Sequence, residues 1–138
     1  VAYFDRHRNR VEPFADVAPV LRGLARRYRL ISLTNGTANP ELTPLRGLFH
    51  HSLTAAEAGA AKPDPALFRH AMAHAGCAPH ECVHLGDDPW MDVEAARAIG
   101  MTAIWVNRYD RTWPDELAPP ELTLTDLHRL LDWLDAGP

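Results

Sequence analysis

The stretch CVHLGDDPWMDVEAARAIGMTAIWVN, residues 82–107, decides the fold of this chain of 138 residues. A short apolar run leads into Asp87 and Asp88, a segment with helical spacing ends at Gly100, and a second apolar run follows. A strand, a helix and another strand in this order predict a βαβ unit with parallel strands. Asp92 adds a third acid just beyond the pair. Because carboxylates this close repel one another, we expect a cation or a shared proton between them.

The length and composition predict a single domain over residues 1–138. Hydrophobic residues make up 46% of the chain, which is enough for a core, and no apolar stretch approaches the roughly 20 residues of a membrane helix. A net charge of −4 and a pI near 6.0 predict neither a nucleic acid nor a membrane as partner. Two cysteines, Cys77 and Cys82, are too few for a disulfide scaffold, so we expect reduced thiols and a cytoplasmic protein.

Short apolar runs predict the strands, and helical spacing lies between them. The runs are mostly unalternating, as is typical of strands buried on both faces of a parallel sheet. They cover residues 28–35, 50–55, 82–87, 101–107 and, more weakly, 121–125. Strands alternating with helices predict a three-layer α/β/α, Rossmann-like sandwich with a mostly parallel sheet.

Four helices are expected, and three of them have recognisable start signals. The first follows Asp16 as its N-cap, and the second starts with the cap Asp64 and Pro65 and stops at Gly76. The third runs from Met91 to Gly100, within the stretch quoted above. The last follows Thr125 as its N-cap and turns leucines inward.

Polar groups follow three of these segments, where ligands bind in open α/β sheets. They are Thr34 with Asn35 and Gly36, Lys62 in AAKPDP, and the acids Asp87, Asp88 and Asp92. Taken singly, each has a plain structural explanation as a turn, a solvated lysine or a helix cap. Together, a hydroxyl, backbone N–H groups, an ammonium and clustered carboxylates predict a site for phosphate and Mg²⁺.

The order of these groups along the chain distinguishes between protein families with similar metal and phosphate sites. Receiver domains also place acids, Thr and Lys around Mg²⁺, but their acids come first. Here LTNG, KPDP and GDDPWMDVEAARAIGM follow one another, and this order resembles motifs two to four of the haloacid dehalogenase (HAD) superfamily. LTNGTANPEL, HLGDD and the tail WPDELAPPELTLTDLHRLLDWL are similar to the branch that includes flavin mononucleotide phosphatase.

This resemblance implies a HAD-like core domain and a Mg²⁺-dependent phosphatase that works through an aspartyl-phosphate. It implies catalytic roles for Thr34, Lys62 and Asp92, phosphate contacts for Thr34, Asn35, Gly36 and Lys62, and Mg²⁺ ligation by Asp87 and Asp88. The expected partner is a small phosphorylated metabolite such as a flavin nucleotide or a sugar phosphate. A non-catalytic module that binds metal and phosphate stays open, and so does a metal-independent haloacid dehalogenase, although Asp87 argues against the latter.

The first motif of the family, DxDxT or DxDxS with its nucleophilic aspartate, has no match in the chain, and Asp5 in VAYFDRHR does not fit it. Residues 1–27 resemble the exit from a cap and the first core helix. We therefore expect a fragment of a longer enzyme that is inactive by itself and lacks the first, central strand. A longer parent would supply that strand, the two open edges would close on each other, or a strand-swapped or edge-paired homodimer would fill the gap.

A pair of histidines and one tryptophan remain to be interpreted. His70 and His74 have a spacing that can bind zinc on a helix, but no third ligand is near in sequence, so we expect no metal there. Trp90, inside the acid loop, is a candidate for contact with a substrate.

Overall fold

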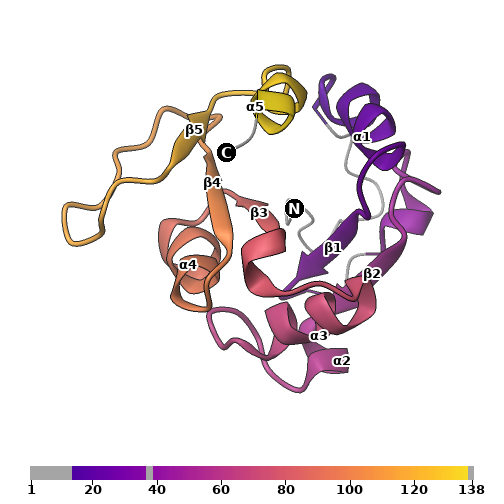
Figure 1. The fold of residues 1–138 in the computed structure, drawn as a ribbon, viewed down its shortest axis with the longest axis horizontal. Helices are drawn as coiled ribbons and strands as arrows, with labels where there is room; N and C mark the ends of the chain where they lie inside the picture. Colours follow the sequence, from indigo (N-terminus) through magenta and orange to yellow (C-terminus); the bar gives the residue numbers. More distant parts are fainter. Residues whose placement is uncertain (1–13, 37–38, 137–138) are drawn as a thin grey trace.

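The computed structural model describes residues 14–36 and 39–136 (Figure 1). The helices are α1 (Val17–Ala25), α2 (Ala55–Ala58), α3 (Ala66–Ala75), α4 (Ala95–Ala98) and α5 (Leu130–Ala136). The strands are β1 (Ile31–Thr34), β2 (His51–Thr54), β3 (Val83–Gly86), β4 (Thr102–Val106) and β5 (Leu122–Leu124). Short 3₁₀ turns lie at Pro40–Leu42 and Pro79–Glu81, and a π-helical turn covers Pro89–Glu94. Each predicted strand is present and lies inside its predicted range.

The strands form two parallel sheets rather than one. β1 pairs with β2, with Leu33 opposite Leu53. In the second sheet β4 lies between β3 and β5, with Leu85 opposite Ile104. Within residues 14–36 and 39–136, no ladder joins β1 to β3. The expected α/β fold with parallel strands is therefore confirmed, and in the described residues β1 and β3 do not pair with each other.

Helices cover both faces of these sheets. β4 shows the division, because Ala103 and Trp105 point into one cluster of buried residues while Ile104 and Val106 point into the other. The first cluster packs under α3 and α4, and the second under α1 and α5, which lie side by side in Figure 1. The chain therefore has the predicted three-layer arrangement.

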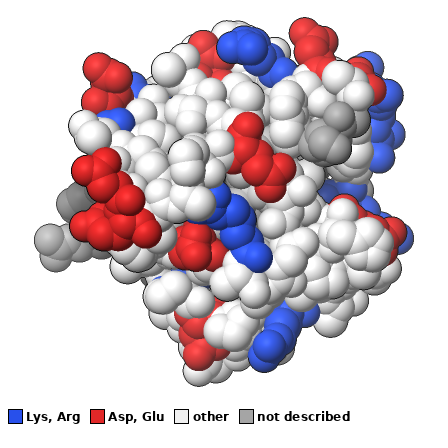
Figure 2. All heavy atoms as spheres, turned by 60° about the vertical axis from the view of Figure 1, so that its left-hand side comes forward, with Lys and Arg blue, Asp and Glu red and all other residues white. Residues whose placement is uncertain are grey.

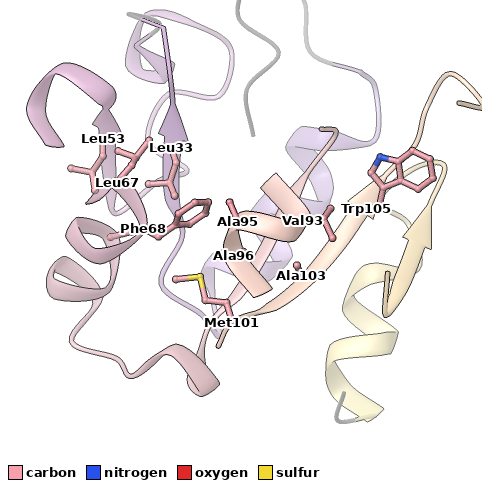
Figure 3. Packing of buried hydrophobic residues seen from close by; sticks show 11 residues of the cluster. Leu33, Leu53, Leu67, Phe68, Val93, Ala95, Ala96, Met101, Ala103 and Trp105 are labelled. Carbon is pink, nitrogen blue, oxygen red and sulfur yellow. The ribbon is translucent and has the colours of Figure 1, made fainter. Parts of the chain in front are cut away.

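Phe68 of α3 connects the two sheets in the first cluster. Figure 3 shows it between the leucines beside β1 and β2 and the small residues of α4. It is completely buried. The leucines are Leu33, Leu53 and Leu67, and the residues on the other side are Val93, Ala95, Ala96, Met101, Ala103 and Trp105. A single aromatic side chain thus packs between parts of the core that share no backbone ladder.

Of the predicted N-caps, Asp16 lies at the expected position before α1, whereas Thr125 does not precede a helix. Asp16 precedes α1 but makes no capping hydrogen bond with its side chain. Instead its carboxylate accepts two hydrogen bonds from the guanidinium of Arg108, each 2.9 Å, and one from the backbone N–H of Leu127 at 2.8 Å. Leu127 lies outside a helix, and α5 starts at Leu130 and not after Thr125. A tertiary partner thus binds the side chain that was expected to cap α1.

The other two helices also begin differently from the prediction. Asp64 accepts a hydrogen bond from the N–H of Ala66, but Pro65 occupies the N-cap position of α3, and Gly76 ends the helix as expected with φ 68°. The expected helix from Met91 to Gly100 is a π-helical turn followed by a short α4.

The described surface shows mixed charges. On the face in Figure 2, acidic and basic side chains lie in small separate groups with broad uncharged areas between them. No helix in the described part of the chain is long and apolar enough to cross a bilayer.

Candidate active site

The carboxyl ends of β1 and β3 meet around one buried lysine. Lys62 lies in the loop before α3 and is 5% exposed, so the reading as a solvated lysine is wrong. Its Nζ lies 2.5 Å from Oδ1 of Asp92, which follows β3, and its backbone contacts Asn35, which follows β1. These contacts bring three segments together that are far apart in the sequence.

Asn35 fixes the backbone of Lys62 through two hydrogen bonds. Its Oδ1 accepts from the N–H of Lys62 at 2.7 Å, and its Nδ2 donates to the carbonyl oxygen of Lys62 at 3.1 Å. A side-chain amide can donate and accept at once, so it matches the two groups of a single backbone residue. Asn35 therefore positions the lysine in addition to its predicted place in an anion-binding loop.

Asp92 is the centre of the buried polar cluster. The residue is 3% exposed, and its carboxylate accepts from Lys62, from Nε2 of His84 at 3.0 Å and from the N–H of Asp88 at 3.1 Å. Burial by itself would raise the pKa of Asp92, but the hydrogen bond from His84 and the charge of Lys62 outweigh it and hold that pKa below its ordinary value. The acid is thus a buried carboxylate paired with Lys62, and its predicted catalytic role stays a prediction.

Close packing leaves Asp92 little room to move. Gly86, the last residue of β3, faces it directly, and a methyl group added at Gly86 would lie 2.2 Å from Cγ of Asp92. The glycine is needed here because the carboxylate occupies the place of its missing side chain.

His84 is a site residue that the sequence reasoning missed. It points from β3 into the cluster, is buried, and its ring stands edge-on to Phe68 at a centroid distance of 4.9 Å. Burial lowers the pKa of His84, although Asp92 opposes the shift, so the neutral ring donates its Nε2 proton to Asp92. The sequence contained one indication of this role, because His84 is the single polar residue inside the apolar run CVHLG.

Asp87 is the best-placed carboxylate for a cation. It follows β3, it is half-buried, and its backbone oxygen accepts a hydrogen bond from Nε1 of Trp105 at 2.9 Å. Its carboxylate accepts no hydrogen bond from another described residue. Burial raises the pKa of Asp87, and the negative charge of Asp92 adds to the effect.

Asp88 has a structural role, and its predicted role as a Mg²⁺ ligand stays a prediction. Its Oδ1 accepts hydrogen bonds from the N–H groups of Trp90 and Met91, at 2.9 and 2.8 Å, and so caps the π-helical turn.

The described residues contain no group of three or more His, Cys, Asp or Glu arranged to hold a metal. His74 belongs to the histidine pair at which we expected no metal. Its ring stacks on the ring of His51, with the two centroids 3.9 Å apart.

Thr34 lies at the end of β1 and is buried. Its Oγ1 accepts a hydrogen bond from the N–H of Gly36 at 3.0 Å, which shapes the turn after the strand. Among the described residues no acceptor takes the proton of this hydroxyl. Trp90 and Met91 stand exposed beside this edge, and Nδ2 of Asn35 lies 3.8 Å from the sulfur of Met91.

Comparison with known proteins identifies the family. The family model for haloacid dehalogenase-like hydrolases matches residues 3–100, and the chain belongs to this family. A 2-haloacid dehalogenase from Pseudomonas syringae pv. Tomato superposes on 95% of this chain and over 56% of its own length, with a TM-score of 0.88 and 35% identity.

Curated relatives include phosphatases. The phosphoserine phosphatase of Thermus thermophilus is 38% identical over 133 residues, which are 92% of this chain and 53% of that protein. The 5-amino-6-(5-phospho-D-ribitylamino)uracil phosphatase YigB of Escherichia coli is 32% identical over 120 residues, 84% of this chain and 50% of that protein. The chain thus spans about half the length of these relatives. A hydrolase of this family is established, while relatives named for both phosphatase and dehalogenase activity leave the reaction open.

Proposed function

We propose that the complete protein hydrolyses phosphomonoesters with Mg²⁺. The observation that carries the proposal is the buried Lys62, paired with Asp92 at the edge where β1 and β3 both end. A buried ammonium beside a half-buried carboxylate suits a dianionic phosphoryl group and a divalent cation better than it suits a monoanionic haloacid. The nearby Thr34 hydroxyl supplies a further donor.

The residues present fit a magnesium ion. Mg²⁺ usually takes one or two protein carboxylates and completes its shell with waters and substrate oxygens. Asp87 offers a half-buried carboxylate that accepts no hydrogen bond from another described residue, and Asp88 offers the oxygen that does not cap the turn. When bound, the ion would offset charge that develops on the phosphoryl group.

The chain's own residues have separate tasks in this proposal. Lys62 holds phosphoryl oxygens and stabilises the charge that the transition state gains, while Asp92 and Asn35 keep it in place. Thr34 donates its hydroxyl proton to a phosphoryl oxygen, and Gly36 leaves room for the backbone near the anion. The attacking carboxylate, which forms an aspartyl-phosphate, would come from polypeptide outside these 138 residues. We therefore expect no turnover by this chain alone.

The proposed substrate is a small phosphorylated metabolite, such as a flavin nucleotide or a sugar phosphate. The two phosphatase relatives support this class, because their names describe small phosphorylated molecules. Trp90 is 49% exposed near the acid loop and offers an aromatic surface to a ring or an apolar part of such a substrate.

Haloacid dehalogenation is the second candidate, and the similarity to the Pseudomonas syringae protein favours it. The two reactions are distinguished by assaying the full-length gene product with p-nitrophenyl phosphate plus Mg²⁺ and with 2-chloropropionate plus a chelator. Phosphate release that needs Mg²⁺ supports the proposal. Chloride release in the chelator without phosphate release overturns it, and absence of both in a folded full-length protein favours the non-catalytic module.

Binding can be tested on the 138-residue chain itself. Calorimetry with Mg²⁺ and inorganic phosphate should show that phosphate tightens the binding of Mg²⁺. Asp87→Asn should abolish this coupling, whereas Asp132→Asn, on an exposed face of α5, should leave it unchanged. Equal coupling in both variants would contradict the assignment of Asp87.

A further inference from the structure

A second asparagine at the same edge of the fold fixes the backbone of an arginine. Asn107 directly follows β4 and is buried. Its Oδ1 accepts a hydrogen bond from the N–H of Arg111, and its Nδ2 donates to the carbonyl oxygen of Arg111, both at 2.9 Å. Asn35 makes the same pair of contacts with the backbone of Lys62. The chain thus fixes the backbones of two cationic residues in the same way.

The turn between Asn107 and Arg111 keeps its side chains outside the core. Asp110 has φ 53°, a left-handed conformation that aspartate adopts more readily than most residues. The side chain of Tyr109 is 67% exposed, and Arg111 is exposed as well. The backbone of Arg111 is therefore held at a defined place while its guanidinium stays accessible.

Arg111 lies beside the acid loop. β3 and β4 are parallel neighbours with Gly86 opposite Trp105, so Asp87 and Asn107 follow adjacent strand ends. The indole N–H of Trp105 donates to the backbone oxygen of Asp87 at 2.9 Å and ties these ends together. Burial raises the pKa of Asp87, and the positive charge of Arg111 opposes this rise. The guanidinium is therefore within electrostatic range of the proposed Mg²⁺ ligand.

The guanidinium of Arg111 forms no ion pair within residues 14–36 and 39–136. The neighbouring Arg108, by contrast, is paired with Asp16. Arg111 instead lies over the ring of Tyr109, with its Cζ 5.7 Å from the ring centroid. Contact with a ring face leaves the in-plane N–H donors of a guanidinium free for other acceptors. Arg111 is thus a positioned cation whose donors face no carboxylate of the described chain.

We propose that Arg111 binds a second anionic group of the substrate, a carboxylate or another phosphate, while the phosphoryl group to be transferred lies at Lys62. The substrate class is then a phosphomonoester that carries two anionic groups. The planar fork of N–H donors on a guanidinium matches two oxygens of either group. This inference rests on the proposed function, which places the phosphoryl group.

The probes are 3-phosphoglycerate and glycerol 3-phosphate, which differ in a carboxylate against an uncharged CH₂OH at the end remote from the phosphate. Calorimetry on the 138-residue chain in excess Mg²⁺ should give 3-phosphoglycerate a Kd about tenfold below that of glycerol 3-phosphate. The bisphosphate of 1,3-propanediol tests the other source of the second anion. Whichever of the two dianionic-ended ligands binds more tightly identifies the group that Arg111 takes.

Variants assign the preference to Arg111. Arg111→Gln removes the guanidinium but keeps the backbone contacts with Asn107, so the preference should fall to about twofold or less, and Arg111→Lys should keep part of it. The matched control is Arg26→Gln, which removes an equal charge from an exposed residue between α1 and the amino end of β1. It should keep the tenfold preference. All variants meet the same ligands and Mg²⁺, so chelation of the ion by a ligand cancels in the comparison.

Asn107→Ala tests the positioning of the arginine. It leaves the charge of Arg111 in place but frees its backbone, so the preference should fall by about threefold. An unchanged preference in a folded Asn107→Ala variant would contradict the positioning role. In case this variant fails to fold, Arg111→Gln still decides the proposal, because residue 111 is exposed.

The outcomes separate this inference from the proposed function. If neither 3-phosphoglycerate nor the bisphosphate binds more tightly than glycerol 3-phosphate, while inorganic phosphate still tightens the binding of Mg²⁺, the inference alone is overturned. If phosphate and Mg²⁺ show no coupling, both are overturned. A preference that persists in Arg111→Gln would show that another group binds the second anion, and would overturn the assignment of Arg111.

Discussion

Replacing Gly86 by alanine should remove a large part of the stability of the chain. The new methyl carbon would lie 2.2, 2.3 and 2.4 Å from Cγ, Cβ and Oδ2 of Asp92. Non-bonded carbon atoms prefer separations of about 3.5 to 4 Å, so Asp92 would have to move by about 1 Å or more. It cannot turn toward solvent, because its surroundings are closed and its carboxylate is bound by Lys62, His84 and Asp88.

Two costs add up in this variant. Overpacking of a well-packed site costs about 1–3 kcal/mol, and loss of one hydrogen bond to a charged group costs about 1.5–3 kcal/mol. The free energy of unfolding should therefore fall by about 4 kcal/mol, which is a large share of the 5 to 15 kcal/mol that is roughly typical of folded domains. At an m value of about 2 kcal/mol/M, the urea midpoint moves down by about 2 M.

Urea unfolding followed by far-UV circular dichroism measures this shift, and Gly23→Ala is the matched control. An alanine methyl at Gly23, inside α1, meets only Cδ2 of Leu131 at 3.7 Å, which is ordinary contact. This control should raise the free energy of unfolding by about 0.5–1 kcal/mol, because alanine favours helix. If Gly86→Ala unfolds within about 0.5 kcal/mol of the parent, Asp92 relaxes freely and the cluster is not the rigid centre described above.

Three further substitutions test the buried polar contacts, each by urea unfolding. Lys62→Met leaves the Asp92 carboxylate without its ammonium partner and should lower the free energy of unfolding by about 3–5 kcal/mol. Arg27→Met, which removes an exposed ion pair with Asp135, should leave the urea midpoint almost unchanged. Equal losses of stability in the two variants would contradict the argument that burial makes the Lys62 pair important. His84→Phe keeps an aromatic ring but removes the donor to Asp92, so it should lower the free energy of unfolding by about 1–3 kcal/mol. His84→Gln, which can still donate, should recover part of this loss. Full stability of the Phe variant would refute the hydrogen bond. Burial acts to raise the pKa of Asp16, but the hydrogen bond from Arg108 outweighs it and holds this pKa below its ordinary value of 3.8. The Asp16 carboxylate therefore stabilises the fold above pH 3.8, and this contribution is lost as the pH falls through the lower pKa of the folded state. Asp16→Asn should therefore cost about 1.5–3 kcal/mol at pH 7 and progressively less below pH 3.8, and a cost independent of pH would contradict the ion pair.

The sequence predicted strands better than helix starts. Each strand is a short apolar run bounded by polar or turn residues, so the signal lies within a few neighbouring positions. The start of α5 was missed, since this helix begins at Leu130 and not after Thr125. The start of α1 after Asp16 was predicted correctly, but the Asp16 side chain binds Arg108 and the N–H of Leu127 instead of capping the helix. Such partners are far away in the chain, and no local pattern reports them.

In the candidate site, the sequence predicted the residue types and their order but not their contacts. Thr34, Lys62 and the acids after β3 follow strand ends, and parallel strands bring such ends to one edge. The two hydrogen bonds from Asn35 to the Lys62 backbone and the donor role of His84 depend on side chains from different segments meeting in space. The predicted metal and phosphate roles stay predictions.

By itself the sequence determined which segments become strands and helices, because side-chain size, apolar spacing and turn residues act over a few positions. It also determined the chemistry available at the strand ends, since the carboxylates, the lysine and the hydroxyl are present in the chain whatever its fold. Only the tertiary structure decided that Asp92 stays ionised inside the protein, because that depends on Lys62 and His84 being packed against it away from water. It likewise decided that the described strands form two separate ladders, because ladders form only between backbones that the packed helices bring side by side.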